Sequence, residues 1–183
     1  MMKKIISLFF CTFFFISVQA QKIIPQIKAG SVITASANMG DDDIPVQFTI
    51  ISLETPMVIG WEVENYGGGS FEMTAKGVEN ANQLYLSQPN LGKISLNDSQ
   101  TFLIISKSAL KSIIENKIFT YNNINFSVKP SDEVIKINGA ETDAIRLLSA
   151  DEKIEIWILN NANFPLIVKS KGLPTNVVVS EIK

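Results

Sequence analysis

Short segments in which apolar and polar residues alternate are the feature that most limits how this 183-residue chain can fold. In residues 44–53, apolar side chains alternate with Gln47 and Thr49, and residues 57–64 repeat the pattern. A period of two residues is typical of a β-strand with one face on a core. Further strands are expected at 31–35, 71–76 and 101–105. The run Gly67-Gly68-Gly69 is interpreted as a hairpin connection, because glycine adopts positive φ without steric cost.

A single segment has the spacing of a helix. Between Ser108 and Lys117 the apolar residues stand at positions i, i+1, i+4 and i+5, which are Ala109, Leu110, Ile113 and Ile114. Lys111 and Glu115 lie four positions apart on the polar face. Ser106 or Ser108 is expected to cap the start, and Asn116 suits the end. Ten residues are too few for a stable isolated helix, so this one is expected to pack on a sheet.

The C-terminal third has the pattern of a meander of short strands. They are expected at 124–128, 134–137, 144–148, 153–159, 164–169 and 177–182, and Asn138-Gly139 is a strong hairpin signal. The segment Lys153–Leu159 carries apolar residues on both faces, which is typical of a strand covered on both sides or lining a cavity. The sequence therefore predicts a mostly β or α+β domain over residues 21–183. Its curved antiparallel meander sheet packs on one short helix at about 106–117.

The segment Ile154–Leu159, an Asn-rich turn and Phe164–Lys169 resemble the end of the lipoprotein-carrier-like (LolA/LolB-like) periplasmic proteins. In that family a strand containing a tryptophan leads through a turn into a strand containing Pro-Leu. The same segment resembles secreted bacterial proteins with a WILNN…FPLI signature. The resemblance implies a strongly curved antiparallel sheet, closed by helices, with an apolar cavity for acyl chains. This chain departs from the carriers in having one clear helix and a single arginine, Arg146.

The N-terminus has the three parts of a secretory signal peptide. Lys3 and Lys4 precede the apolar stretch Ile5–Val18, and Val18-Gln19-Ala20 places small residues where signal peptidase cleaves. Residues 1–20 are therefore interpreted as a signal peptide cleaved before Gln21, and the protein as secreted or periplasmic. Fourteen apolar residues are too few to span a membrane, so no integral membrane span is expected after cleavage.

The residues left after cleavage exclude several kinds of chemistry. They contain no cysteine and no histidine, since the one Cys is Cys11, and this excludes disulfides, thiol nucleophiles, Cys/His zinc sites and Ser-His-Asp triads. Loss of Lys3 and Lys4 changes the net charge from −2 to −4. A single arginine and an acidic balance argue against a nucleic-acid partner. Neither a cofactor nor a metal is expected.

Three motifs were weighed for catalysis or metal binding. Ser108-Ala109-Leu110-Lys111 matches the Ser-x-x-Lys motif of penicillin-recognising enzymes, but the companion motifs are absent, which favours a helix cap. Glu62, Glu64 and Glu72 could form a carboxylate pair for glycoside hydrolysis, yet they are typical of a solvated sheet face balanced by Lys76. Asp41-Asp42-Asp43 lacks the alternating spacing of calcium loops and is interpreted as a solvated turn.

Two tryptophans and their neighbours are the candidate ligand-binding residues. A tryptophan in a sheet this apolar is more often a core residue than a cavity residue. A cavity between Trp61, Trp157 and the Ile113 face of the helix would favour binding of an apolar ligand, and a filled core there would count against it. The candidate residues are Trp61, Phe71, Met73, Trp157 and Leu159.

Three functions are compatible with this sequence. The favoured one is a non-catalytic exported protein of the cell envelope that binds an apolar small molecule or an envelope protein on its curved sheet. The alternatives are a structural or adhesion module of the β-sandwich type and a small carboxylate-based hydrolase.

Overall fold

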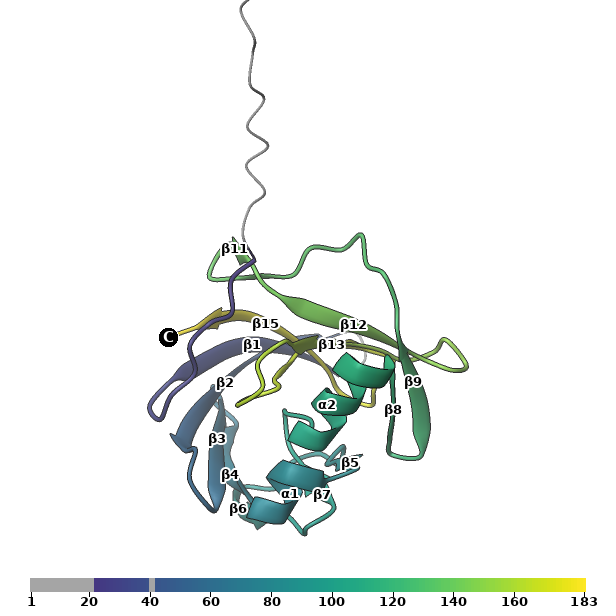
Figure 1. Cartoon of the computed structure of the whole chain (residues 1–183). Coiled ribbons are helices and arrows are strands. Elements are labelled where there is room, and N and C mark those ends of the chain that lie inside the picture. The colour runs from purple at the N-terminus through teal and green to yellow at the C-terminus, as the bar shows by residue number, and fades with distance from the viewer. Residues whose placement is uncertain (1–21, 40–41) are drawn as a thin grey trace, which may run out of the picture.

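The computed structural model describes residues 22–39 and 42–183, so the expected signal peptide and its cleavage site lie outside the described residues (Figure 1). Eleven strands form one large sheet. In chain order they are β1 (Val32–Met39), β2 (Asp42–Ser52), β3 (Met57–Val63), β4 (Gly67–Met73), β6 (Gly92–Ser95), β8 (Ile118–Tyr121), β9 (Ile124–Val128), β12 (Ala144–Ser149), β13 (Glu155–Leu159), β14 (Ile167–Lys171) and β15 (Asn176–Ile182). The remaining elements are β5 (Gln83–Leu84), β7 (Gln100–Thr101), β10 (Lys136–Ile137), β11 (Ala140–Glu141), and the helices α1 (Ala75–Asn80) and α2 (Lys107–Asn116).

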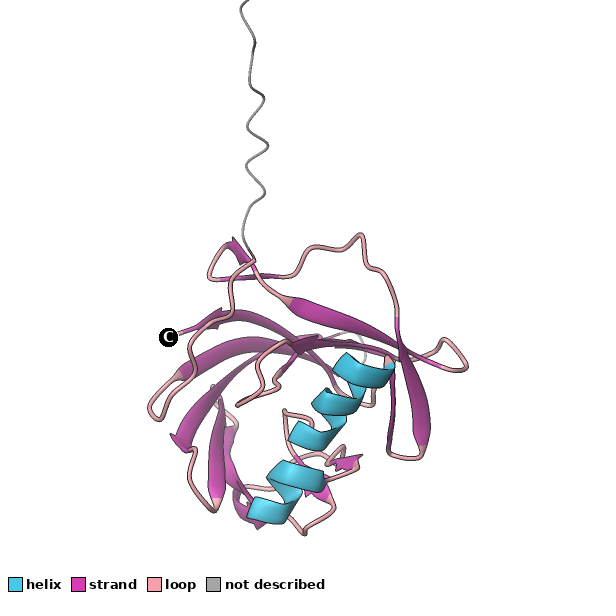
Figure 2. Ribbon diagram, viewed as in Figure 1, coloured by secondary structure: helices cyan, strands magenta, loops and turns pink. Residues whose placement is uncertain are grey.

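The large sheet has the order β6-β4-β3-β2-β1-β15-β14-β13-β12-β9-β8. Its neighbours are antiparallel except for β4 and β6, which are parallel. The first strand pairs with the last, because β1 is hydrogen-bonded to both β2 and β15. The sheet curves around the two helices, which lie on its inner side (Figure 2). The predicted mostly β or α+β class is therefore confirmed, and one curved sheet takes the place of the two packed layers of a sandwich.

Helix α2 is the predicted helix, and a buried polar network fixes its start. Ser106 is the N-cap: its Oγ accepts a hydrogen bond from the Ala109 amide at 3.3 Å and donates one to the Ala81 carbonyl at 2.7 Å. The Tyr121 hydroxyl lies 2.8 Å from Thr101 Oγ1 and accepts a bond from the Ser106 amide. Burial raises the pKa of Tyr121. The helix ends at Asn116, as expected, and Lys117, with φ +61°, is its C-cap.

The region after β4 differs from the prediction. The strand expected over 71–76 ends at Met73, and α1 follows, so the described residues contain a second helix. Thr74 caps this helix by accepting a hydrogen bond from the Gly77 amide at 2.9 Å. The alternation of residues 71–76 could not show this break, because Thr74 favours an N-cap as well as a strand.

The three consecutive glycines lie within β4, and the hairpin turn is formed by residues 64–66 before them. A side chain at Gly68 would collide with the Trp61 carbonyl, and one at Gly69 with the Gly92 carbonyl. Glycine is therefore required here for the close approach of β3, β4 and β6, and only Gly67 has positive φ.

The predicted C-terminal meander is confirmed, with β9, β12, β13, β14 and β15 pairing in series. Asn138 and Gly139 form the expected turn, with φ of +55° and +74°, but it joins the two-residue strands β10 and β11. The strand expected over 101–105 is reduced to β7 and one bridge between Ile104 and Leu166.

Strand β13 is covered on both faces, as its sequence predicted. Ile156 and Ile158 are buried in a cluster with Leu110 and Ile113 of α2. Trp157 and Leu159, which alternate with them, belong to the other hydrophobic cluster of the protein. The central position of β13 therefore divides its side chains between two cores.

Candidate ligand-binding cavity

An apolar cavity of about 300 Å³ lies between the inner face of β1–β3 and an irregular segment, residues 85–91. This volume is at the lower end of the range for small-molecule sites. Its wall is almost entirely aliphatic and aromatic. The lining residues are Ala37, Ile44, Val46, Phe48, Trp61, Val63, Tyr66, Leu84, Tyr85, Leu86, Ser87, Gln88, Pro89, Phe102, Leu103, Ile167, Ser170, Leu173, Thr175 and Val177.

The strand period places one face of β2 and β3 in the cavity wall. Ile44, Val46 and Phe48 line it from β2, while Trp61 and Val63 line it from β3. Gln47 and Glu62 alternate with these residues, are opposite each other in the sheet, and are exposed. The same alternation that predicted these strands therefore decides which side chains reach the cavity.

The segment 85–91 closes the cavity opposite the sheet and contributes Tyr85, Leu86, Ser87, Gln88 and Pro89. It is anchored at its start, where the Tyr85 amide donates a hydrogen bond to the Thr101 carbonyl at 2.8 Å. Ser87 and Gln88 are exposed to solvent while also lining the cavity. The cavity therefore opens to solvent beside these two residues.

Trp61 is the one predicted ligand-binding residue that lines the cavity. It is 5% exposed, and its Nε1 is buried without a hydrogen-bond partner among the described residues. A Cβ atom at Gly69 would lie 3.0 Å from this Nε1. Because the nitrogen is buried beside Gly69, Trp61 presents the carbon atoms of its indole to the cavity.

Phe71 and Met73 support the cavity wall from behind. Both are fully buried, and both contact Phe102, which lines the cavity. The Phe71 ring stacks on the Phe102 ring with centroids 3.7 Å apart, and the Met73 sulfur accepts a hydrogen bond from the Phe102 amide at 3.3 Å. These two predicted residues therefore position an aromatic residue that the sequence analysis did not single out.

Trp157 and Leu159 lie away from the cavity. They are 1% and 0% exposed and pack in one hydrophobic cluster, while Ile113 of α2 is fully buried in the other. The cavity therefore adjoins Trp61 but not Trp157 or the Ile113 face of the helix, where the interior is filled.

Trp157 is covered by cations instead. Lys169 Nζ, Lys171 Nζ and Arg146 Cζ lie 5.2, 5.3 and 5.9 Å from the centre of its ring. Such distances are typical of cation–π contacts. We call residues 129–143, which join β9 to β12 across the outer side of the sheet, the outer strap (Figure 1).

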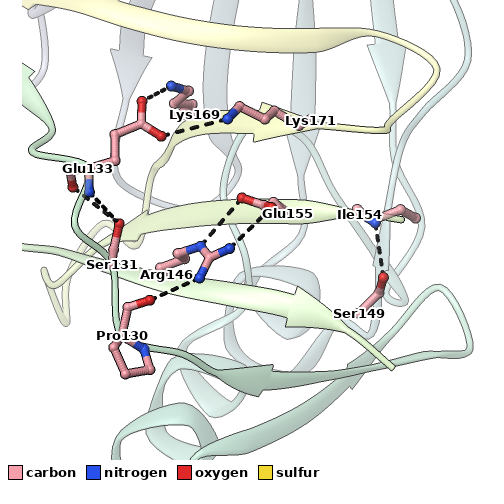
Figure 3. Close-up of polar contacts among 9 residues, drawn as sticks. All are labelled: Pro130, Ser131, Glu133, Arg146, Ser149, Ile154, Glu155, Lys169 and Lys171. Carbon is pink, nitrogen blue, oxygen red and sulfur yellow. Dashed lines mark hydrogen bonds and ion pairs between the residues drawn. The ribbon is translucent and has the colours of Figure 1, made fainter. Parts of the chain in front are cut away.

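Ion pairs fasten the outer strap over these cations (Figure 3). Glu133 pairs with both Lys169 and Lys171, and its hydrogen bond to Lys169 lowers the pKa of Glu133. Arg146 pairs with Glu155 at 3.1 Å and donates a hydrogen bond to the Pro130 carbonyl at 2.9 Å. All three cations are thus engaged within the protein.

Glu62 and Glu72, the candidate carboxylate pair, lie apart on the sheet. Glu62 is opposite Gly68 and Glu72 is opposite Val58, so four residue steps of β3 lie between them. Glu72 pairs with Lys93 at 2.6 Å, whereas Lys76, the expected partner, pairs with Asp98.

The Ser-x-x-Lys motif is also not assembled for nucleophilic attack. The Lys111 ammonium pairs with Glu115 at 3.9 Å, and Ser108 Oγ lies 3.3 Å from Ser106 Oγ. The observed partners are those of an exposed helix face and its cap.

Of the three aspartates, Asp41 lies outside the described residues, while Asp42 and Asp43 begin β2. Asp43 accepts a hydrogen bond from Asn38 at 3.1 Å. Within residues 22–39 and 42–183, no group of three or more acidic, His or Cys side chains is arranged to hold a metal ion. The helices of that same part of the chain are all too short or too polar to cross a membrane.

A second hollow, near the start of α2, has a mixed polar wall. It includes Glu54, Glu79 and Lys107, and the last two form an ion pair at 3.6 Å. Its charged wall is unsuited to the apolar ligand that the sequence suggested.

The residues that close the cavity, chiefly Phe102 and the segment 85–91, are not among those predicted from the sequence. The signal present in the sequence was Leu84-Tyr85-Leu86, an apolar run followed by Ser-Gln-Pro with no helix or strand period. All three residues of this apolar run line the cavity.

Comparisons of the chain with protein-family models, with curated proteins and with solved structures found no match.

Proposed function

We propose that this protein is a non-catalytic, exported protein of the cell envelope that binds an apolar small molecule in the cavity beside Trp61. The observation that carries the proposal is the cavity wall, in which strands β1–β3 and the segment 85–91 present aliphatic and aromatic side chains to an empty volume of about 300 Å³. Export is inferred from the signal-peptide pattern of residues 1–20.

The binding energy in such a site comes from removing apolar surface from water. Each buried methylene group contributes about 0.8 kcal/mol, so affinity should rise roughly tenfold for every two methylenes until the cavity is full. The rigid rings of Trp61 and Phe102 lose little conformational freedom when a ligand binds. The curved sheet with an apolar interior is also what the resemblance to lipoprotein-carrier-like proteins implies, which supports the proposal.

The test is the binding of a fluorescent apolar probe, N-phenyl-1-naphthylamine, to the purified mature chain. We expect saturable fluorescence enhancement in the wild type and its loss in Val63→Phe, because Val63 lines the cavity. The matched control is Val58→Phe, the same substitution on the same strand but on the opposite face.

Equal probe binding by wild type and Val63→Phe, with both folded by circular dichroism, would overturn the proposal. Loss of binding in Val58→Phe as well as Val63→Phe would also contradict it, because the effect would then not be specific to the cavity.

A further inference from the structure

The cavity contains no charged side chain among the described residues, although 19% of the chain is Asp, Glu, Lys or Arg. An anionic or cationic group buried against Phe48, Trp61 and Phe102 would have no counter-ion, and a cation–π contact would not offset the lost hydration of a cation. Burying an unpaired charge is strongly unfavourable. The wall therefore selects against a ligand whose charge enters the cavity.

The polar side chains of the wall are neutral. Ser87 and Gln88 belong to the segment 85–91, and Thr175 belongs to the loop between β14 and β15. Ser170 also lines the cavity, but its Oγ already accepts a hydrogen bond from the Val177 amide at 2.9 Å. Tyr66 and Tyr85, which each carry a hydroxyl group, also line the cavity. Ser87 and Gln88 are exposed, so the polar end of a ligand beside them would stay in contact with solvent.

We propose that the ligand is an uncharged amphiphile, with its hydrocarbon part against Phe48, Trp61 and Phe102 and its hydroxyl or amide end beside Ser87 and Gln88. This inference rests on the proposed function and adds the chemical class and the orientation of the ligand. A cavity of about 300 Å³ is at the lower end of the range for small-molecule sites. A ten-carbon chain is therefore a suitable probe, and a folded peptide segment is too large.

The experiment compares three ten-carbon probes that differ only in the head group. At pH 8, 1-decanol, decanoate and decyltrimethylammonium are titrated against the mature chain preloaded with N-phenyl-1-naphthylamine. We expect 1-decanol to displace the probe at a concentration at least tenfold lower than either charged compound.

Because an alcohol is intrinsically more apolar than a carboxylate, charge variants provide the decisive measurement. Gln88→Lys should improve displacement by decanoate relative to 1-decanol at least fivefold, since the ammonium would lie beside the head group. Gln47→Lys is the matched control: it makes the same change in charge on the outer face of β2, and it should leave this ratio unchanged.

The outcomes separate the two proposals. Equal displacement by all three probes, or a preference for a charged one, overturns the neutral class while binding itself stands. A ratio that Gln88→Lys leaves unchanged, or that Gln47→Lys changes equally, overturns the orientation. Failure of N-phenyl-1-naphthylamine to bind overturns the proposed function and this inference together.

Discussion

The two arms of the curved sheet differ in how their faces are covered. The first arm, β1–β4, has a cavity on its inner side, while Gln47 and Glu62 on its outer side are exposed. The second arm, β12–β14, packs on α2 inside and is covered by the outer strap outside, although Ile167 and Ser170 of β14 also reach the edge of the cavity. Each arm contains one tryptophan. Trp61 adjoins empty space, and Trp157 is enclosed.

The difference follows from the element that faces each arm. A helix presents several apolar side chains in one stripe, and Ala109, Leu110 and Ile113 of α2 fill the space above β13. The first arm is faced in part by the irregular segment 85–91, which includes Ser87, Gln88 and Pro89. Such a segment cannot fill the interior as closely. The cavity is therefore where a helix does not cover the sheet.

The largest expected effect is the cost of truncating an isoleucine in the filled arm. Ile113→Ala should destabilise the protein by about 2–5 kcal/mol, because it creates a new cavity in a close-packed cluster. Ile44→Ala, the matched change in a residue that already lines the cavity, should cost less than about half as much. Urea denaturation of both variants measures this, and equal costs would remove the distinction between the arms.

The second prediction compares the same two arms by adding side-chain volume at an alanine instead of removing it. Ala109→Leu should overpack the space under α2 and cost about 1–3 kcal/mol. Ala37→Leu places the same three extra carbons into the cavity and should change stability by less than about 0.5 kcal/mol while weakening the binding of N-phenyl-1-naphthylamine. Thermal unfolding and the probe titration provide the two readings. A large cost for Ala37→Leu would indicate that the first arm is as filled as the second.

Because Glu133 joins the outer strap to the second arm, we expect its contribution to the stability of the protein to depend on pH. The pKa of Glu133 is lowered from its usual 4.5, first by its hydrogen bond to Lys169 and then by the charges of Lys169 and Lys171. A carboxylate with a lowered pKa stabilises the folded state above that usual value, and the contribution is lost as the pH falls through the folded-state pKa. Because the Glu133 side chain is 40% exposed, Glu133→Gln should cost at most about 1 kcal/mol at pH 7.

This difference between wild type and Glu133→Gln should be smaller at pH 3 than at pH 7, as measured by urea denaturation at both pH values. Glu115→Gln, in an exposed pair on α2, is the control and should show little difference at either pH. A cost for Glu133→Gln that persists undiminished at pH 3 would show that the ion pairs do not fasten the strap.

The smallest effect is expected on the outer side of the first arm. Glu62→Gln should change stability by less than about 0.5 kcal/mol, because exposed side chains away from special contacts contribute little. It should also leave binding of N-phenyl-1-naphthylamine unchanged. A marked loss of binding or stability in Glu62→Gln would show that this face has a role that the cavity does not explain.

Much of the sheet was predictable because, in a strand with one buried face, the alternation of apolar and polar residues indicates which side chains are buried. The alternation in β2 and β3, the covered strand β13 and the hairpin at Asn138-Gly139 all follow from local pattern. Helix α1 did not, because Thr74 fits a strand as well as a cap. The prediction that Gly67-Gly68-Gly69 form the hairpin turn was wrong. These glycines lie in β4, where they allow the close approach of β3 and β6.

The candidate site was predicted less completely than the fold. Trp61 lines the cavity, and Phe71 and Met73 support Phe102 behind its wall. Trp157 and Leu159 share the apolar character of these residues but lie in the filled core. An apolar side chain looks the same in the sequence whether it faces a cavity or another side chain.

The sequence by itself determined the class of fold, the strands of the meander, helix α2 and the chemistry excluded by the lack of His and Cys beyond residue 20. These properties depend on composition and on periods of two or 3.6 residues, which are local. The tertiary structure decided where the interior is empty and which charges meet. Both depend on how residues 85–91 and the outer strap pack against strands distant in sequence. Packing volume and ion pairing are properties of whole neighbourhoods, and no local pattern encodes them.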